Sequence, residues 1–304
     1  MTNDGRRPVG VEWPTMLVAL GCWSSLAAAL VVHDRLWWPV VLVWLAVSGG
    51  WYMSLQHEVI HGHPTPSRLV NTAIAATPLS LWLPLPVYRD IHLRHHEVEL
   101  TRAGVDPESF YVTRATWDEA SVVRRLVLRC NRTLAWRILV NPLVSIPSHV
   151  VAELGRARAE GTLGRIWLPH ALGVLAVGWV VIDLAQMPAW MYLVGYCWGG
   201  MSVSSLRSFA EHLAVEEPAT RSAVVRSNWF FGLLFLNNNL HHTHHALPGA
   251  AWYRLPRLTR ELGSEELAAR GAGLYRGYLD IARRYGVRAF STPVSPLERS
   301  AGSS

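Results

Sequence analysis

The chain has 304 residues, half of them hydrophobic, and only 16% of them are charged. A typical soluble domain carries about 25% charged residues. The chain also holds 15 tryptophans, a residue that favours the membrane–water interface, so the composition predicts an integral membrane protein. Its net charge of +6 comes from arginines scattered along an apolar chain, which argues against nucleic-acid binding. The three cysteines are far apart and form no C-x-x-C pair, which argues against a disulfide framework or an iron–sulfur site.

Four apolar stretches are predicted to cross the membrane as helices, each of which needs about 20 residues to span the hydrocarbon core. They are residues 14–33, 40–55, 166–185 and 189–206. The predicted fold is therefore an all-α integral membrane protein with four transmembrane helices and a helical cytosolic cap. The two short turns between paired spans contain only Arg35 as a basic residue. By the positive-inside rule, both termini then face the cytoplasm.

Three further segments have patterns of their own. Residues 70–87 are apolar but contain three prolines, so a re-entrant or interfacial segment is expected instead of a fifth span. Residues 134–151 are amphipathic and interrupted by proline, which favours a position in the membrane interface. An amphipathic helix is predicted over Ser264–Tyr285, followed by a disordered end rich in Ser, Pro and Gly.

Closely spaced histidines occur in three segments. Residues 57–63 have the sequence HEVIHGH, residues 92–96 have HLRHH, and residues 241–245 have HHTHH. On a helix, residues three or four apart share one side, so each segment aims two or three imidazoles in one direction. His212 directly follows the last predicted span, which gives it the same membrane depth as these clusters. The candidate metal ligands are His57, His61, His92, His95, His96, His212, His241, His244 and His245.

Nine imidazoles exceed what one zinc ion can use, because zinc sites usually have four ligands. The set suits two metal ions, and imidazole is compatible with iron, zinc, copper and nickel. A ligating histidine usually donates its second ring N–H to a carboxylate or carbonyl. We therefore hypothesise that some of the carboxylates near the clusters support the ligands: Glu58, Asp90, Glu97, Glu99, Asp106, Glu108 and Glu211. His63, Asn237 and His242 are further candidates for this role. The remaining histidines, His33, His149 and His170, are expected to be structural.

These clusters resemble the histidine boxes of the membrane-bound fatty acid desaturase and hydroxylase superfamily. The boxes of that superfamily are H-x(3–4)-H, H-x(2–3)-H-H and H-x-x-H-H, and the three clusters match them in order. Glu211-His212 is similar to the family's extra histidine, and the asparagines before His241 are similar to a lead-in common in bacterial members. The resemblance implies a desaturase-like membrane domain over residues 14–250, a cytosolic segment 1–13 before it, and a cytosolic C-terminal helix and tail over residues 251–304.

The resemblance also implies a cofactor, a reaction and a location. The cofactor is a non-haem di-iron centre, which uses O2 and two external electrons to oxidise an unactivated C–H bond. A desaturase of a fatty acyl or related alkyl chain is favoured, and a hydroxylase or ketolase is the alternative within the family. The chain shows no cytochrome b5-like or rubredoxin-like segment, so a separate ferredoxin- or rubredoxin-type electron donor is expected. The implied location is a bacterial inner membrane, with the metal site on the cytoplasmic side.

Two readings from other functional classes remain open at this point. His57-Glu58-Val59-Ile60-His61 also matches H-E-x-x-H, the motif of zinc metalloproteases, in which the glutamate is the general base. An intramembrane zinc protease would leave seven of the clustered histidines unexplained. A metal transporter would place polar groups near the middle of the membrane, whereas these histidines lie at the ends of the predicted spans. In the oxidase reading, Trp51, Trp82 and Trp198 are candidates to line the substrate pocket.

Overall fold

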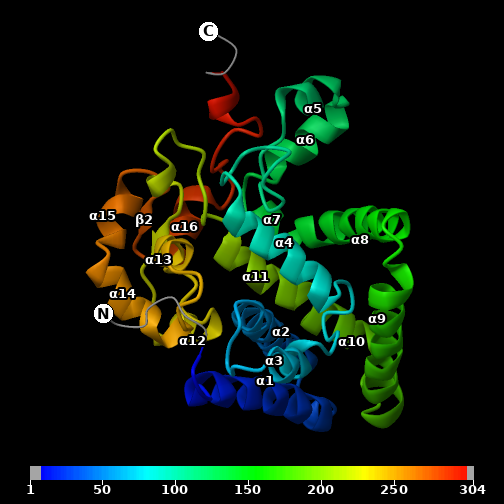
Figure 1. Cartoon of the computed structure of the whole chain (residues 1–304). Coiled ribbons are helices and arrows are strands. Elements are labelled where there is room, and N and C mark those ends of the chain that lie inside the picture. Colours follow the sequence, from blue (N-terminus) through cyan, green and yellow to red (C-terminus); the bar gives the residue numbers. More distant parts are fainter. Residues whose placement is uncertain (1–7, 300–304) are drawn as a thin grey trace. The chain divides into compact units, whose positions relative to one another are not determined.

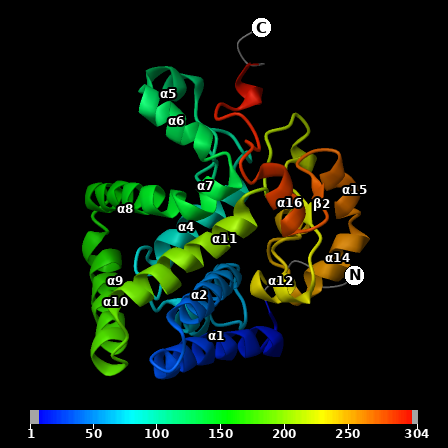
Figure 2. The same ribbon diagram turned by 180° about the vertical axis from the view of Figure 1, so that it is seen from behind.

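The computed structural model describes residues 8–299, and these residues are mostly helical (Figures 1 and 2). Two compact units are distinguished within them. The unit that we call the membrane unit comprises residues 8–89 and 140–204, and the one that we call the histidine unit comprises residues 90–139 and 205–299. Residues 1–7 of the predicted cytosolic segment 1–13 lie outside the described residues.

Helices make up the membrane unit. They are α1 (Trp13–Val32), α2 (Trp38–Ile60), α3 (Arg68–Ala75), the start of α4 (Leu85–Glu97), α8 (Asn141–Ala159), α9 (Leu163–Gly178), the π-helical η1 (Trp179–Leu184), α10 (Ala189–Tyr192), the π-helical η2 (Leu193–Gly199) and most of α11 (Gly200–Ser208). The predicted amphipathic stretch 134–151 is divided between α7 (Leu134–Leu139) and α8.

Three helical segments are long and apolar enough to cross a membrane. They are α1, α2 and the continuous helix Leu163–Leu184 formed by α9 and η1. These segments confirm three of the four predicted spans, and α2 extends beyond the predicted end at residue 55 to Ile60. The fourth predicted span forms consecutive helical segments from Ala189 to Ser208 but is not among the candidate spans of the described residues. The count of four spans therefore stays a prediction.

The first helix has two different sides. The buried residues of α1 recur at helical spacing: Thr15, Val18, Ala19, Cys22, Leu26 and Ala29. Leu17, Leu20 and Val31 on its other side are all more than 60% exposed. In water such exposure would oppose folding, but it suits contact with lipid. The two blue helices α1 and α2 lie side by side in both views (Figures 1 and 2).

Close backbone packing joins α2 to η2 and α11. A Cβ at Gly49 would lie 2.5 Å from the carbonyl oxygen of Tyr196 and 3.1 Å from the Cα of Gly200. Small residues allow helices in membranes to approach this closely. We expect Gly49→Ala to lower the free energy of unfolding by about 1–3 kcal/mol, the usual penalty for overpacking. Thermal unfolding in detergent measures it, and Gly155→Ala in α8, where a Cβ meets nothing within 4 Å, is the control that must not destabilise.

The proline-rich segment 70–87 does not form a spanning helix, as predicted. Helix α3 ends at Ala75, and the chain runs in turns and bends to the start of α4 at Leu85. Irregular backbone at membrane depth must have its polar groups satisfied, and here side chains from neighbouring helices donate to its carbonyl oxygens. The donors and acceptors are Trp23 to Ile74 (3.2 Å), Gln56 to Ala75 (3.0 Å), Tyr52 to Thr77 (2.8 Å), Tyr192 to Leu79 (2.7 Å) and His170 to Leu81 (3.1 Å).

Shorter elements build the histidine unit. They are the rest of α4, α5 (Arg114–Glu119), α6 (Val122–Cys130), α7, the end of α11, η3 (Pro218–Thr220), β1 (Val224–Val225), α12 (Trp229–Leu234), α13 (His241–Ala246), η4 (Trp252–Arg254), α14 (Leu255–Glu261), α15 (Ser264–Ala269), β2 (Leu274–Tyr275), α16 (Tyr278–Tyr285) and η5 (Pro296–Arg299). Strands β1 and β2 are parallel, with Val224 opposite Leu274 and Val225 opposite Tyr275.

The C-terminal region differs from its prediction. The single helix expected over Ser264–Tyr285 is wrong, because α15 and α16 are separated there by strand β2. Two glycines cause the break: Gly273 and Gly277 have φ angles of +122° and +154°, which L side chains rarely adopt. The expected disorder after residue 285 is also wrong as far as residue 299, since the Phe290 amide donates to the Arg132 carbonyl at 2.7 Å. Residues 300–304 lie outside the described part of the chain.

Candidate metal centre

The clustered histidines lie at or near helix ends. In the membrane unit, His57 is buried in the last turn of α2 and His61 directly follows that helix, with ring centroids 4.8 Å apart. The second cluster occupies the last turns of α4, and the third forms most of α13. His212 follows α11, and an isolated antiparallel bridge to Ser222 fixes its backbone.

Four histidines of the histidine unit, which we call the four-histidine group, converge on one point: His95, His212, His241 and His245. One ring nitrogen of each lies within 4.8 Å of the corresponding atom of every other member. The Nε2 atom of His212 is 3.1 Å from that of His95 and 2.9 Å from that of His241. The Nε2 atom of His245 is 3.1 Å from that of His241. Since metal–imidazole bonds are about 2.0–2.1 Å long, neighbouring ligands of one ion have nitrogens about 3 Å apart.

The Nδ1 atoms in this group explain why the Nε2 atoms point at one another. His95 Nδ1 lies 2.7 Å from the Asp106 carboxylate, and His241 Nδ1 lies 3.2 Å from Asn238 Oδ1. His212 Nδ1 lies 3.3 Å from the Arg221 carbonyl oxygen. These acceptors assign the N–H to Nδ1 in each ring, which leaves a lone pair on each Nε2. Facing lone pairs at about 3 Å repel one another, so the arrangement fits a shared cation and not a network of hydrogen bonds.

A second convergence lies beside it in the same unit. The Nε2 atom of His96 is 3.1 Å from those of both His92 and His244. His92 Nδ1 is held 2.8 Å from the Glu108 carboxylate. The rings of His96 and His245 stack with centroids 4.3 Å apart. All seven candidate ligands of the histidine unit are therefore drawn together, from α4, α13 and the residue after α11.

Burial keeps most of these imidazoles neutral. It lowers the pKa of His96 and of His212 to about 3, and the neighbouring histidines add to the shift. The pKa values of His241 and His245 are also well below the ordinary value, with burial again the main cause. For His95, burial lowers the pKa, but the hydrogen bond to Asp106 and nearby carboxylates outweigh it and raise the pKa. A neutral imidazole can bind a metal without first losing a proton.

We expect the metal-free protein to become less stable as the pH falls below about 6.5. The pKa of His96 and of His212 is 6.5 ordinarily and about 3 in the folded chain. Between those values the unfolded chain binds protons that the folded chain does not, so the free energy of unfolding decreases by roughly 1.4 kcal/mol per pH unit for each such histidine. His95, with its raised pKa, contributes in the opposite sense. Tm values of chelator-treated protein at about pH 7.5 and about pH 5.5 test this, and equal values would refute it.

The predicted supporting residues have mixed outcomes. Asp106 is buried and accepts a hydrogen bond from His95 Nδ1. Glu211 is buried, with its carboxylate 3.4 Å from His241 Nδ1 and 3.1 Å from Arg207, and burial raises its pKa. Glu58 is buried in the last turn of α2. Glu97 differs from its prediction, since it is exposed on α4 and forms no hydrogen bond to a histidine among residues 8–299.

Two further candidates, Asn237 and His242, lie off the convergence points. Asn237 donates to the Trp252 carbonyl at 3.1 Å, and its neighbour Asn238 is the residue that supports His241. The Nε2 atom of His242 donates to the Ala219 carbonyl at 3.0 Å, which turns its ring away from the four-histidine group.

Besides Glu58, the membrane unit contains one more predicted supporting residue, His63, and a carboxylate holds its ring. His63 is buried, with Nδ1 2.6 Å from Glu12. The three histidines expected to be structural contact other parts of the membrane unit. His33 Nδ1 donates to the Leu30 carbonyl, His170 donates to the Leu81 carbonyl, and His149 packs edge-on against Trp82. Asn238 and the Arg221 carbonyl are the supports that our candidates did not include. Glu108, one of the carboxylates named near the clusters, lies 2.8 Å from His92 Nδ1, and the asparagine run before His241 was the available signal for Asn238.

Comparison with known proteins agrees with this geometry. The family model described as fatty acid desaturase matches residues 36–277, which include all nine candidate ligands and more than half of the chain. A search of the curated proteins finds none that matches. The chain therefore belongs to the fatty acid desaturase family.

Proposed function

We propose that the protein is an O2-dependent oxidase of unactivated C–H bonds that desaturates a fatty acyl or related alkyl chain. Family membership already makes it an oxidoreductase and a membrane protein with a lipid-like substrate. The observation that carries the finer proposal is the four-histidine group, in which one ring nitrogen of each histidine lies within 4.8 Å of those of the others. A protein of this family with such a donor set is built to hold a metal ion.

The proposed cofactor is a pair of iron ions. The four-histidine group would hold one ion, and the other candidate ligands, His57, His61, His92, His96 and His244, are proposed for the second. When bound, such a centre supplies the activation of O2 with two external electrons. The chain itself supplies neutral imidazoles, carboxylates and an amide that fix their orientation, and burial that excludes water. Groups that accept the N–H of a ligating histidine in this way tune the affinity of a site for its metal.

The electron donor and the orientation in the membrane complete the proposal. We expect a separate ferredoxin- or rubredoxin-type donor, since the arginine-rich polar segments would attract an acidic partner and would do so less at high salt. Both termini and the metal site are proposed to face the cytoplasm of a bacterial inner membrane. The family match over residues 36–277 covers all three histidine boxes, whereas an H-E-x-x-H protease would use only the first of them.

Metal analysis of the detergent-purified protein tests the cofactor, and product analysis tests the reaction. We expect about two irons per chain and an alkene when an acyl lipid, O2 and a reduced ferredoxin are supplied. About one zinc per chain, unchanged by His244→Ala but lost on His57→Ala, would overturn the proposal. Iron together with an alcohol or ketone product would replace the desaturase by a hydroxylase or ketolase of the same family.

A further inference from the structure

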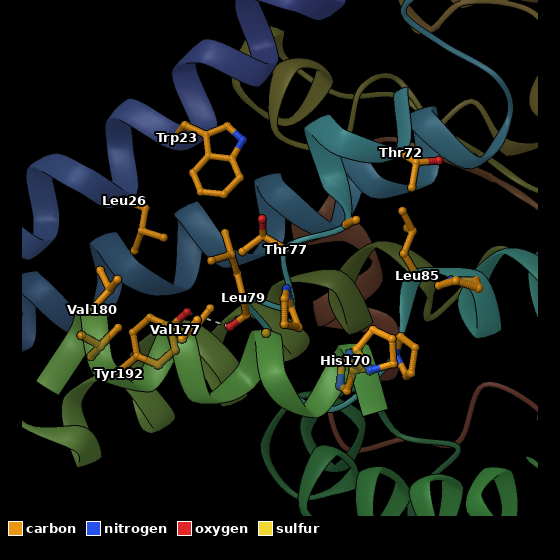
Figure 3. A pocket seen from close by; sticks show the side chains of 18 of the residues that line it. Trp23, Leu26, Thr72, Thr77, Leu79, Leu85, His170, Val177, Val180 and Tyr192 are labelled. Carbon is orange, nitrogen blue, oxygen red and sulfur yellow. Dashed lines mark hydrogen bonds between the residues drawn. The ribbon is translucent and has the colours of Figure 1, made fainter. Parts of the chain in front are cut away.

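The membrane unit contains a pocket of about 720 Å³ bounded by α1, α9 and the segment that joins α3 to α4 (Figure 3). Its volume lies within the ~300–1,000 Å³ typical of small-molecule sites. Figure 3 shows Trp23 and Leu26 on one wall, Val177 and Tyr192 on another, and Leu79 between them. The walls are mainly hydrocarbon, so the pocket suits an apolar ligand.

The proposed metal site does not account for this pocket. None of the nine candidate ligands lines it, and neither do Trp51, Trp82 and Trp198, the tryptophans predicted to line a substrate pocket. Its one histidine is His170, whose Nε2 donates to the Leu81 carbonyl at 3.1 Å. That bond, with the one from Tyr192 to Leu79, holds the irregular segment as a fixed wall.

The pocket opens to the surface of two candidate membrane spans. Trp23 on α1 and Val180 on η1 line it and are 36% and 38% exposed. Ala27 on α1 and Ala176 on α9 also line it and are exposed. Because these helices are apolar enough to lie in hydrocarbon, a ligand entering between them comes from the bilayer. An acyl chain is the molecule that the bilayer offers in abundance.

The lining of the pocket carries one positive charge. Arg165 lines it from the first turn of α9, is exposed, and has no carboxylate partner within residues 8–299. The residues that line the pocket include no aspartate or glutamate. An arginine near the end of a span reaches the depth of the lipid headgroups, where it forms charge-assisted hydrogen bonds with phosphate. The charge therefore favours an anionic headgroup over a zwitterionic one.

We propose that this pocket binds an anionic phospholipid of the bilayer, with one acyl chain among α1, α9 and the 76–86 segment and its phosphate on Arg165. This lipid is distinct from the substrate of the proposed oxidase. The proposal does not depend on the metals or on turnover, so it stands or fails separately from the proposed function.

Photo-crosslinking of the full-length protein in detergent micelles tests the site. The probe is phosphatidylglycerol with a diazirine in one acyl chain, and mass spectrometry locates the labelled residues. We expect labelling of residues that line the pocket, competed by unlabelled phosphatidylglycerol and much less by phosphatidylcholine. Arg165→Gln is expected to lower the affinity about tenfold, the ratio that follows from losing one charge-assisted hydrogen bond. Arg158→Gln, an exposed arginine of α8 outside the pocket, is expected to change nothing.

A second pair of variants tests the acyl-chain part. Ala27→Phe fills the pocket from α1 and is expected to abolish labelling there, whereas Ala28→Phe, exposed on the same helix but outside the lining, is expected to leave it intact. Ala176→Phe fills the pocket from α9 and is expected to have the same effect, so the test does not depend on the folding of one variant. The Tm of each variant shows whether it is folded. Labelling outside the pocket alone, equal competition by phosphatidylcholine or by oleate, or equal loss in the paired controls would each overturn the proposal.

Discussion

Replacing His212 with alanine is expected to remove metal from the four-histidine group and to abolish C–H oxidation. His212 lies close to every other member of that group, since its Nε2 lies 2.9 Å from that of His241 and 3.1 Å from that of His95. Its ring centroid is also within 4.7 Å of that of His245. Alanine removes one of the four ring nitrogens that would hold the ion and leaves a space where the imidazole was.

The decrease in metal affinity should exceed the ~10–100-fold decrease that follows from removing a residue that only supports a ligand. Iron per chain is expected to fall from about two to about one or less, and turnover is expected to fall below detection. Metal analysis and product analysis on the same preparation measure both. A His212→Ala protein that keeps its full iron content would show that the convergence of these rings does not create a metal site.

The matched control is His242→Gln. His242 belongs to the same histidine box as His241, but its Nε2 donates to the Ala219 carbonyl at 3.0 Å instead of facing the other rings. The glutamine side chain also carries an N–H donor and can reach the same carbonyl. We expect this variant to keep its full iron content and activity, whereas His212→Ala loses both. That result would show that a histidine is a ligand because of where its ring nitrogen points, and not because it belongs to a histidine box.

The sequence predicted the clustering of the histidines better than the groups that hold their rings in place. Spacings such as those of His92, His95 and His96 fix which residues share a side of a helix, so the boxes can be recognised from the sequence alone. The supporting atoms depend on the path of the chain outside helices. Asn237 and Asn238 show this: Asn237 has a φ of +53°, and this turn directs its side chain to Trp252 and that of Asn238 to His241. Composition and spacing say nothing about such a turn.

The errors at the level of the fold have a similar origin. Apolar periodicity predicted α1, α2 and the helix Leu163–Leu184, because a long run of one kind of residue leaves little choice of structure. The same reasoning extended one helix across residues 264–285, where Gly273 and Gly277 adopt positive φ and allow a strand to pair with β1. That pairing is a contact between residues about fifty positions apart, which local propensity cannot anticipate.

Asp106→Asn is expected to weaken metal binding and activity about 10–100-fold without unfolding the protein. Asp106 is buried and accepts three hydrogen bonds. Its Oδ1 accepts from His95 Nδ1 at 2.7 Å and from the Glu108 amide at 2.9 Å, and its Oδ2 accepts from the Thr101 amide at 2.8 Å. A carboxylate is the side chain that can accept on both oxygens.

Asparagine has the same shape but only one acceptor atom, so one of its two orientations must be chosen. If its NH2 group faces Thr101, two donors meet and the buried Thr101 amide loses its acceptor, which costs about 1–3 kcal/mol of stability. If its NH2 group faces His95, the imidazole is driven to the other tautomer, with the proton on Nε2, and that nitrogen can no longer bind a metal. Either orientation leaves His212 in place, so the site is weakened and not removed.

This difference gives the measurement. Titration with ferrous iron is expected to refill the Asp106→Asn protein at high metal concentration, whereas the His212→Ala protein stays deficient at every concentration. Glu97→Gln is the matched control, because Glu97 lies on the same helix as His95 but is exposed and without a bond to a histidine among the described residues. If Asp106→Asn and Glu97→Gln bind iron equally well, the carboxylate of Asp106 does not orient His95, and the tautomer assigned to that ring from this contact is wrong.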